Sequence, residues 1–205
     1  MNCFRRSAGL LLPAFVLAAM VVPLRAQQGS ILGPQDYSAV MVIHTGGKTI
    51  RQNVAKRGLK YRQIMQIPGR PPMTTLMMLD THKMYMIMSP QMCMESPLGQ
   101  MPPLAQLQQE AKKQGHVKDL GPATITVGGH SYATEHLRMT YTTKKGQTFT
   151  SDVWTANALH HFPVQIETPD GKTRITYQNI KLSSPSAALF IPPANCHSMG
   201  GMGRP

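Results

Sequence analysis

The C-terminal end of this 205-residue chain gathers side chains that bind soft metals. A thiol, an imidazole and two thioethers occur within seven residues, and these ligand types suit Cu(I). The four residues concerned are Cys196, His197, Met199 and Met202. This segment suggests one functional hypothesis, a copper-binding or metal-handling envelope protein, although the cluster is single and its ligand motif is not repeated.

The full chain holds 16 methionines, and many of them are concentrated in its middle part. Met84, Met86 and Met88 alternate with Tyr85 and Ile87, and alternate residues of a strand point to one face of a sheet. Thioether side chains are flexible and polarizable, so such a face suits acyl chains of varied shape, or it is plain core. The residues expected to line a hydrophobic ligand cavity are Met77, Met84, Met86, Met88, Met94, Leu104, Leu107 and Trp154.

Sequence motifs of common enzymes do not occur. There is no Gly-x-Ser-x-Gly, no His-Glu-x-x-His and no phosphate-binding glycine loop. The eight histidines are scattered, and with only nine acidic residues nothing supports a paired-carboxylate site. The sequence therefore predicts a non-catalytic protein without a cofactor.

Two of the three cysteines, Cys93 and Cys196, lie outside the N-terminal region. In an oxidising compartment they can pair, and a loop of about 100 residues would stabilise the fold by about 4 kcal/mol in the chain-entropy model. The alternative is two free thiols, and the sequence leaves this choice open.

The N-terminal 26 residues have the pattern of a secretory signal peptide. Arg5 and Arg6 precede a charge-free apolar run over 8–22, and Ala26 follows at a plausible cleavage point. The run is too short and too interrupted by proline to span a membrane well. We expect a periplasmic or secreted protein, not an integral membrane protein, divided into a signal peptide (1–26), one domain (27–193) and a flexible tail (194–205).

The chain is strongly basic, with a formal net charge of +12, or +9 once the signal peptide is removed. In an exported protein this excess favours an anionic envelope partner, such as anionic lipid, lipopolysaccharide or an acidic protein, over nucleic acid. The alternative is that lysine and arginine simply solvate the outer face.

Turn residues recur at hairpin spacing, which predicts an antiparallel meander. The predicted strands are 36–44, 49–56, 59–67, 74–79, 83–88, 91–95, 116–120, 123–127, 131–142, 148–155, 163–168 and 173–182. Between them, Pro102-Pro103 begins an amphipathic helix carrying Leu104 and Leu107, which ends near Gly115. A helix of about three turns needs support from other elements, so we expect it to lie against the sheet in an α+β fold.

The closing section of the chain resembles the LolA/LolB-like superfamily of periplasmic lipoprotein carriers. The matching motifs are Val153-Trp154, Phe162-Pro163-Val164, Ile175 to Ile180 and Leu189-Phe190-Ile191-Pro192-Pro193, with Lys83-Met84-Tyr85 earlier. The resemblance covers roughly 36–193. It implies a single curved antiparallel sheet, an unclosed half-barrel with one or a few helices against its concave face, and a concave face that holds acyl chains.

These observations lead to three hypotheses. The first is an exported binding protein that holds a lipid or an acylated protein in a half-barrel cavity. The second is copper handling by the C-terminal cluster. The third is an envelope-associated structural protein whose basic face docks on an anionic partner.

Overall fold

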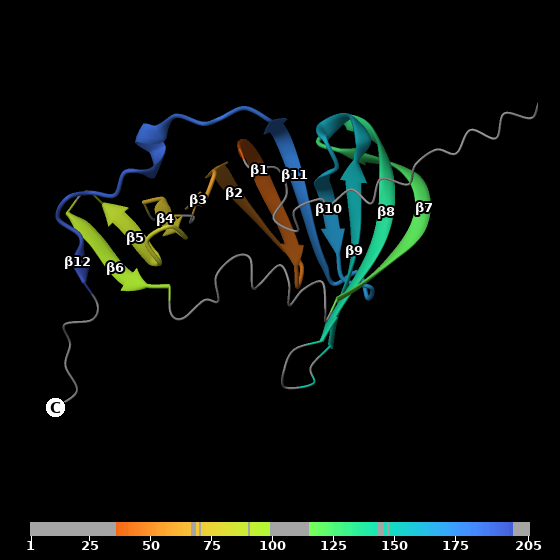
Figure 1. Ribbon diagram of the computed structural model, residues 1–205, viewed down its shortest axis with the longest axis horizontal. Helices are drawn as coiled ribbons and strands as arrows, with labels where there is room; N and C mark the ends of the chain where they lie inside the picture. The colour runs from red at the N-terminus through yellow and green to blue at the C-terminus, as the bar shows by residue number, and fades with distance from the viewer. Residues whose placement is uncertain are drawn as a thin grey trace, which may run out of the picture.

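The computed structural model describes residues 36–66, 69, 71–89, 91–98, 115–142, 146 and 148–198. Within these residues, twelve strands form one sheet in the order β12-β6-β5-β4-β3-β2-β1-β11-β10-β9-β8-β7. The sheet curves and does not close on itself (Figure 1), so β12 and β7 are its two edges. This confirms the predicted single, unclosed antiparallel sheet, which is the architecture that the LolA/LolB-like resemblance implied.

The long strands form two meanders, β1–β6 and β7–β11, which lie side by side in the sheet. Their bounds are β1 Asp36–Thr45, β2 Lys48–Arg57, β3 Lys60–Met65, β4 Met73–Met78, β5 Lys83–Ser89, β6 Met92–Pro97, β7 Gly115–Val127, β8 His130–Thr142, β9 Thr148–Ala156, the 3₁₀ helix η1 Asn157–Leu159, β10 Phe162–Glu167, β11 Thr173–Lys181, the 3₁₀ helix η2 Ala187–Phe190 and β12 His197–Ser198. Two pairings join segments far apart in the chain: β1 with β11, which are antiparallel, and β6 with β12, which are parallel. The predicted helix, with Leu104 and Leu107, lies outside the described residues, as does the predicted signal peptide.

Tight turns explain why consecutive strands pair. Gly46 and Gly47 link β1 to β2 with φ angles of 54° and 74°, a backbone conformation that glycine adopts without a steric cost. Two-residue turns of this kind match the twist of the flanking strands. The sequence-encoded turn therefore fixes the register from Asp36 opposite Arg57 to Thr45 opposite Lys48.

Two clusters of buried side chains form on the sheet. The larger one lies around β1 and contains Tyr37, Ala39, Met41, Val54, Ala156, Phe162 and Val164. The smaller one lies on β4–β6 and contains Leu76, Met78, Tyr85 and Cys93. Each face of the sheet therefore carries one buried cluster.

The part of the chain described here has no helix with the length and apolarity that crossing a bilayer requires.

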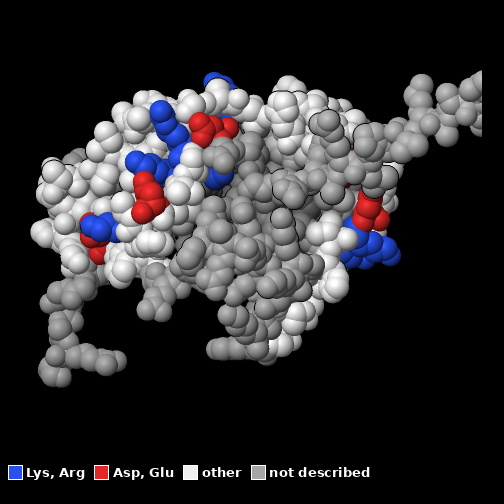
Figure 2. Space-filling model, in the orientation of Figure 1, with Lys and Arg blue, Asp and Glu red and all other residues white. Residues whose placement is uncertain are grey.

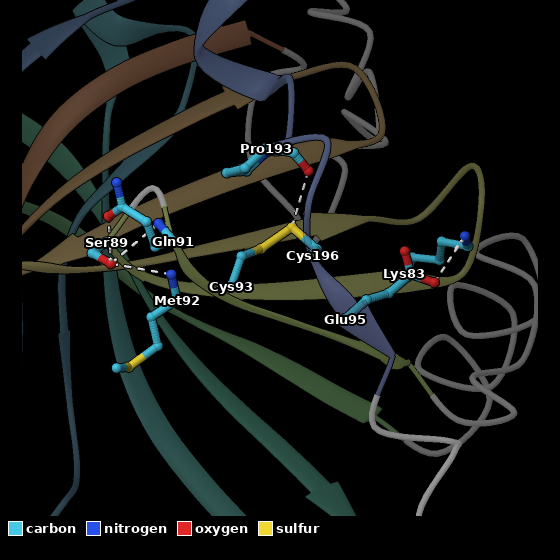
Figure 3. Close-up of a disulfide and its surroundings, with 8 residues drawn as sticks. All are labelled: Lys83, Ser89, Gln91, Met92, Cys93, Glu95, Pro193 and Cys196. Atoms are coloured by element: carbon cyan, nitrogen blue, oxygen red, sulfur yellow. Dashed lines mark hydrogen bonds and ion pairs between the residues drawn. A yellow bond between two sulfur atoms is a disulfide. The ribbon is translucent and has the colours of Figure 1, made fainter.

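A C-terminal strap, residues 182–198, connects the two halves of the sheet. It leaves β11, passes through η2 and reaches β12, which pairs in parallel with β6 (Figure 1). Cys196 in this strap forms a disulfide with Cys93 of β6, 103 residues earlier in the chain (Figure 3). The strap is thus tied to the sheet at residues 196–198, in a segment that the sequence analysis assigned to the flexible tail.

Candidate ligand-binding face

Strand register brings the central methionines together on one face of β3–β6. Residues directly opposite each other in an antiparallel pair share a face. Met77 of β4 lies opposite Met84 of β5, and Met86 of β5 lies opposite Met94 of β6. We call this surface the methionine face, and its members are Met65, Met73, Met77, Met84, Met86 and Met94.

Two members of this face, Met65 and Met73, were not among the residues predicted from the sequence. They lie opposite each other in the β3–β4 hairpin, and Met65 also lies opposite Gln52 of β2. Their own spacing along the chain gave no sign of this proximity, because it depends on the hairpin register. In the sequence, the short gap between the predicted strands 59–67 and 74–79 was the indication that these strands pair.

The methionine face continues into the larger core cluster. Tyr61 of β3 lies opposite Met77, and it packs against the cluster that contains Tyr37. Burial raises the pKa of both tyrosine hydroxyls above the usual value, so both stay neutral donors at physiological pH. This side of the sheet therefore runs from a buried, aromatic region at β1 to the methionine face on β3–β6.

The two faces of β4–β6 differ in how they are covered. On one face Leu76 and Cys93 are each 1% exposed, within the smaller core cluster that the strap's Cys196 also joins. On the other face the six methionines are all half-buried. Apolar area in contact with water costs about 25 cal/mol per Å². This row of half-buried thioethers is therefore a surface with capacity to bind an apolar ligand.

Met88 departs from the regular pattern. The pairing of β5 with β6 is irregular between Ile87 and Ser89, and Met88 is 36% exposed. An irregularity of this kind changes the direction of the local side chain. Regular alternation thus supports a common direction for Met84 and Met86, and the shared direction expected for Met88 stays a prediction.

Trp154, also expected to line the cavity, lies in the other half of the sheet. Its ring stacks on His136 of β8, with ring centroids 4.3 Å apart and planes 9° from parallel, and it packs against the larger core cluster. Trp154 and the methionine face therefore border the same cluster from opposite sides rather than meeting each other. Leu104 and Leu107 lie outside the described residues.

A polar ladder flanks Trp154. Arg138 Nε and Nη2 donate to the two carboxylate oxygens of Asp152 at 2.7 and 2.8 Å. This bidentate hydrogen bond lowers the pKa of Asp152, against the opposing effect of burial. His136 Nε2 lies 3.8 Å from Asp152 Oδ2. Asp152 therefore stays ionised, and the group serves to hold β8 and β9 in register.

Two polar residues of β2 interrupt the apolar surface. Gln52 lies between Met41 and Met65 in the cross-strand direction, is 4% exposed, and its Oε1 accepts no hydrogen bond within the described structure. Lys56 lies opposite both Tyr37 and Tyr61, and burial lowers its pKa. A buried amide oxygen without a donor is costly, so Gln52 marks a position where a donor group from elsewhere would be stabilising.

The disulfide bears directly on the copper hypothesis. Cys196 is bonded to Cys93, so its sulfur is not a thiolate ligand in the oxidised protein. His197 belongs to β12 and is exposed, whereas Met199 and Met202 lie outside the described residues. Among the residues described, no group of three or more His, Cys, Asp or Glu side chains is placed to hold a metal ion.

Three hollows in the described surface have no methionine in their lining. One is lined by His44, Lys48, Lys172 and Arg174 at the β1–β2 and β10–β11 turns. Two others border the strap, around Leu189 and around Phe190. Lysine or arginine side chains line each of these hollows.

Comparisons with known proteins locate similarity in the fold alone. No protein-family model matches the chain, and no curated protein sequence matches it. Solved structures with a similar fold include the Mycobacterium tuberculosis lipoprotein LppX, at 15% identity over 76% of this chain and 91% of that chain, with a TM-score of 0.44.

Two further structures have the same kind of similarity. A putative outer membrane lipoprotein-sorting protein domain from Vibrio parahaemolyticus has 10% identity, covers 76% of this chain and 88% of its own, and gives a TM-score of 0.28. A DUF1329 family protein from Desulfovibrio piger has 13% identity, with 77% and 90% covered and a TM-score of 0.26. At these identities no residue role is transferred to this chain.

Proposed function

We propose that this chain is an exported, non-catalytic binding protein that holds the acyl chain of a lipid, or of an acylated protein, against the methionine face. The observation that carries the proposal is the row of six half-buried methionines on one face of β3–β6. Unbranched thioether side chains adapt to a ligand whose shape varies, whereas branched aliphatic side chains would fix one shape.

The surroundings of the face support this assignment. The opposite side of β4–β6 is already packed by Leu76, Met78 and Tyr85, so the methionines are not needed to close that core. Gln52 adds one unpaired acceptor at the border of the apolar surface. A ligand with an acyl chain would contact the methionine face, and a donor group near its head, such as an amide or hydroxyl, would pair with Gln52.

Substitution of the face tests the proposal. The variant Met77→Thr, Met84→Thr, Met86→Thr keeps residues that favour strands but removes three thioethers. Each lost apolar contact is worth about 1 kcal/mol, so affinity for a fluorescent fatty-acid probe should fall at least about tenfold. The matched control is Val117→Thr, Met139→Thr, Phe149→Thr on β7–β9, which should bind the probe as the parent does.

Both variants must first be shown to be folded by circular dichroism and thermal melting. A folded methionine variant with unchanged probe affinity would show that the methionines are core filler. Equal loss in the control variant would show that binding is not confined to the methionine face.

Native mass spectrometry of the purified protein identifies the kind of ligand. The proposal predicts bound lipid in the envelope-derived protein. Bound copper without lipid would instead favour the metal-handling hypothesis, and would direct attention to His197, Met199 and Met202.

We also propose that the chain is cleaved after Ala26, on the pattern of the N-terminal region. N-terminal sequencing of protein from the envelope fraction should begin at Gln27. Protein that retains Met1 in the cytoplasm would contradict both export and the compartment in which the disulfide forms.

A further inference from the structure

Two exposed apolar side chains lie at the short helix η2, Leu189 within it and Ile191 directly after it. Its Phe190 is 2% exposed, whereas the neighbouring Leu189 and Ile191 are 39% and 70% exposed. Backbone hydrogen bonds from Leu189 N to Ser186 O and from Ile191 N to Ala188 O fix the turn. Because Phe190 anchors the turn, Leu189 and Ile191 lose little conformational freedom when they bind a surface.

Basic side chains flank η2 on both sides. Arg57 and Lys60 line the hollow that contains Phe190, and Arg62 and Lys181 line the hollow that contains Leu189. Figure 2 shows basic side chains, interspersed with acidic ones, over the end of the molecule that carries η2. The surface therefore combines fixed apolar side chains with cations around them.

Two local acids, Asp36 and Asp80, offset only part of the charge of these four cations. Arg57 Nη1 donates to the backbone carbonyl of Pro185 at 2.8 Å, which ties it to the strap rather than to a carboxylate. Asp36 accepts from the backbone of Gly58 at 2.8 Å, and its hydrogen bond with the Ser184 side chain is the main cause of its lowered pKa. Lys60 lies 3.8 Å from Asp80, with both side chains 38% exposed, a weak pair in water.

We propose that η2 and its four flanking cations, Arg57, Lys60, Arg62 and Lys181, form a docking surface for an anionic lipid bilayer. Apolar side chains surrounded by lysine and arginine suit the boundary between headgroups and acyl chains of a membrane, and the cations are attracted to anionic lipid. This inference rests on the proposed function, since a carrier of acylated ligands must meet the membrane that supplies or receives them.

Co-sedimentation with vesicles tests the surface. The mature protein should bind vesicles of phosphatidylcholine and phosphatidylglycerol in equal parts, and bind vesicles of phosphatidylcholine alone at least about tenfold more weakly, a difference that added salt reduces. The variant Leu189→Ser, Ile191→Ser should lose at least about tenfold in affinity for the anionic vesicles. The variant Arg62→Gln, Lys181→Gln should bind more weakly and with less dependence on salt.

The matched control is Val117→Ser, Phe149→Ser, which removes two other exposed apolar side chains, 61% and 51% exposed, on β7 and β9. It should bind the anionic vesicles as the parent does. Equal binding to both kinds of vesicle, equal loss in the control, or binding to an acidic protein without any binding to vesicles would each overturn the proposal.

The fatty-acid probe, used without vesicles, separates this proposal from the proposed function. Folded docking variants should bind the probe as the parent does. If the parent binds anionic vesicles through η2 but never binds the probe, the carrier function fails and the docking surface stands. If the parent binds the probe but not the anionic vesicles, the docking surface alone fails.

Discussion

The two halves of the sheet reach stability by different means. In β7–β9, long strands pair over many residues, and cross-strand polar contacts such as Thr140 with Thr150 and Arg138 with Asp152 reinforce the register. In β3–β6, the strands are short, one face carries half-buried methionines, and the strap and disulfide cover the other.

This difference indicates that the two halves of the sheet have different roles. A sheet with one packed face and one adaptable face can bind a ligand without losing its own core. Leu76 and Tyr85 pack on the face opposite the methionines, so a ligand on the methionine face need not disturb them. The polar ladders of β7–β9 give the other half a fixed shape. We therefore expect the β3–β6 half to rely on the disulfide for its stability more than the β7–β9 half does.

The disulfide should have the largest effect on stability. Replacing Cys93 and Cys196 together by alanine removes a link between residues 103 positions apart, and the chain-entropy model gives a loss of about 4–5 kcal/mol. Thermal melting of the double variant should show a strongly lowered transition, as should the parent under reducing agent. An unchanged melting temperature in both would refute the dependence of β3–β6 on this bond.

Removal of a core aromatic should come next. Phe162 is 1% exposed and makes edge-to-face contacts with Tyr37 and Tyr177 at centroid distances of 5.0 and 5.3 Å. Phe162→Ala should lower the free energy of unfolding by about 3–5 kcal/mol, whereas Met84→Ala on the half-buried face should lower it far less. Chemical denaturation measures both, and equal losses would mean that the methionine face is as tightly packed as the core.

The smallest effect concerns the ion pair of β8 and β9. Arg138→Gln should lower the free energy of unfolding only slightly at neutral pH, since the Arg138 side chain is 44% exposed and water screens the pair. The lowered pKa of Asp152 stabilises the fold above about pH 4, and that contribution is lost as the pH falls through the folded-state pKa. The difference between parent and variant should therefore shrink in acid.

The control for this prediction is Lys172→Gln, which breaks a pair with Asp170 whose side chains are 81% and 53% exposed. It should leave the melting temperature unchanged. A difference between parent and Arg138→Gln that stays constant down to acidic pH would show that Arg138 acts through packing rather than through Asp152.

Local signals in the sequence predicted most of the sheet, because glycine turns and alternating residues act within a few positions. Two elements differ from the prediction: β12, which lies in the segment expected to be a flexible tail, and β7, expected as two strands on either side of Gly121-Pro122. β7 is a single strand with an irregularity between Asp119 and Gly121, where Gly121 has a φ of 97°. The long partner β8 supplies the pairing that bridges this interruption.

The candidate site was predicted only in part, because Met77 and Met94 were expected beside Met84 and Met86 whereas Met65 and Met73 were not. Alternation placed Met84 and Met86 on one face, but the proximity of Met65 and Met73 depends on hairpin register. The pairing of Cys93 with Cys196 depends on the path of the strap over the whole sheet. Such contacts between distant segments have no signature at short spacing, which is why the sequence left the disulfide open.

The most direct test of the central claim is photo-crosslinking with a diazirine-bearing fatty acid, followed by digestion and mass spectrometry. The proposed function predicts saturable labelling, competed by unlabelled fatty acid, in peptides that cover β3–β6, and loss of that labelling in the variant Met77→Thr, Met84→Thr, Met86→Thr. Labelling confined to β7–β9, or labelling that unlabelled fatty acid does not compete, would contradict the assignment of the methionine face as the ligand site.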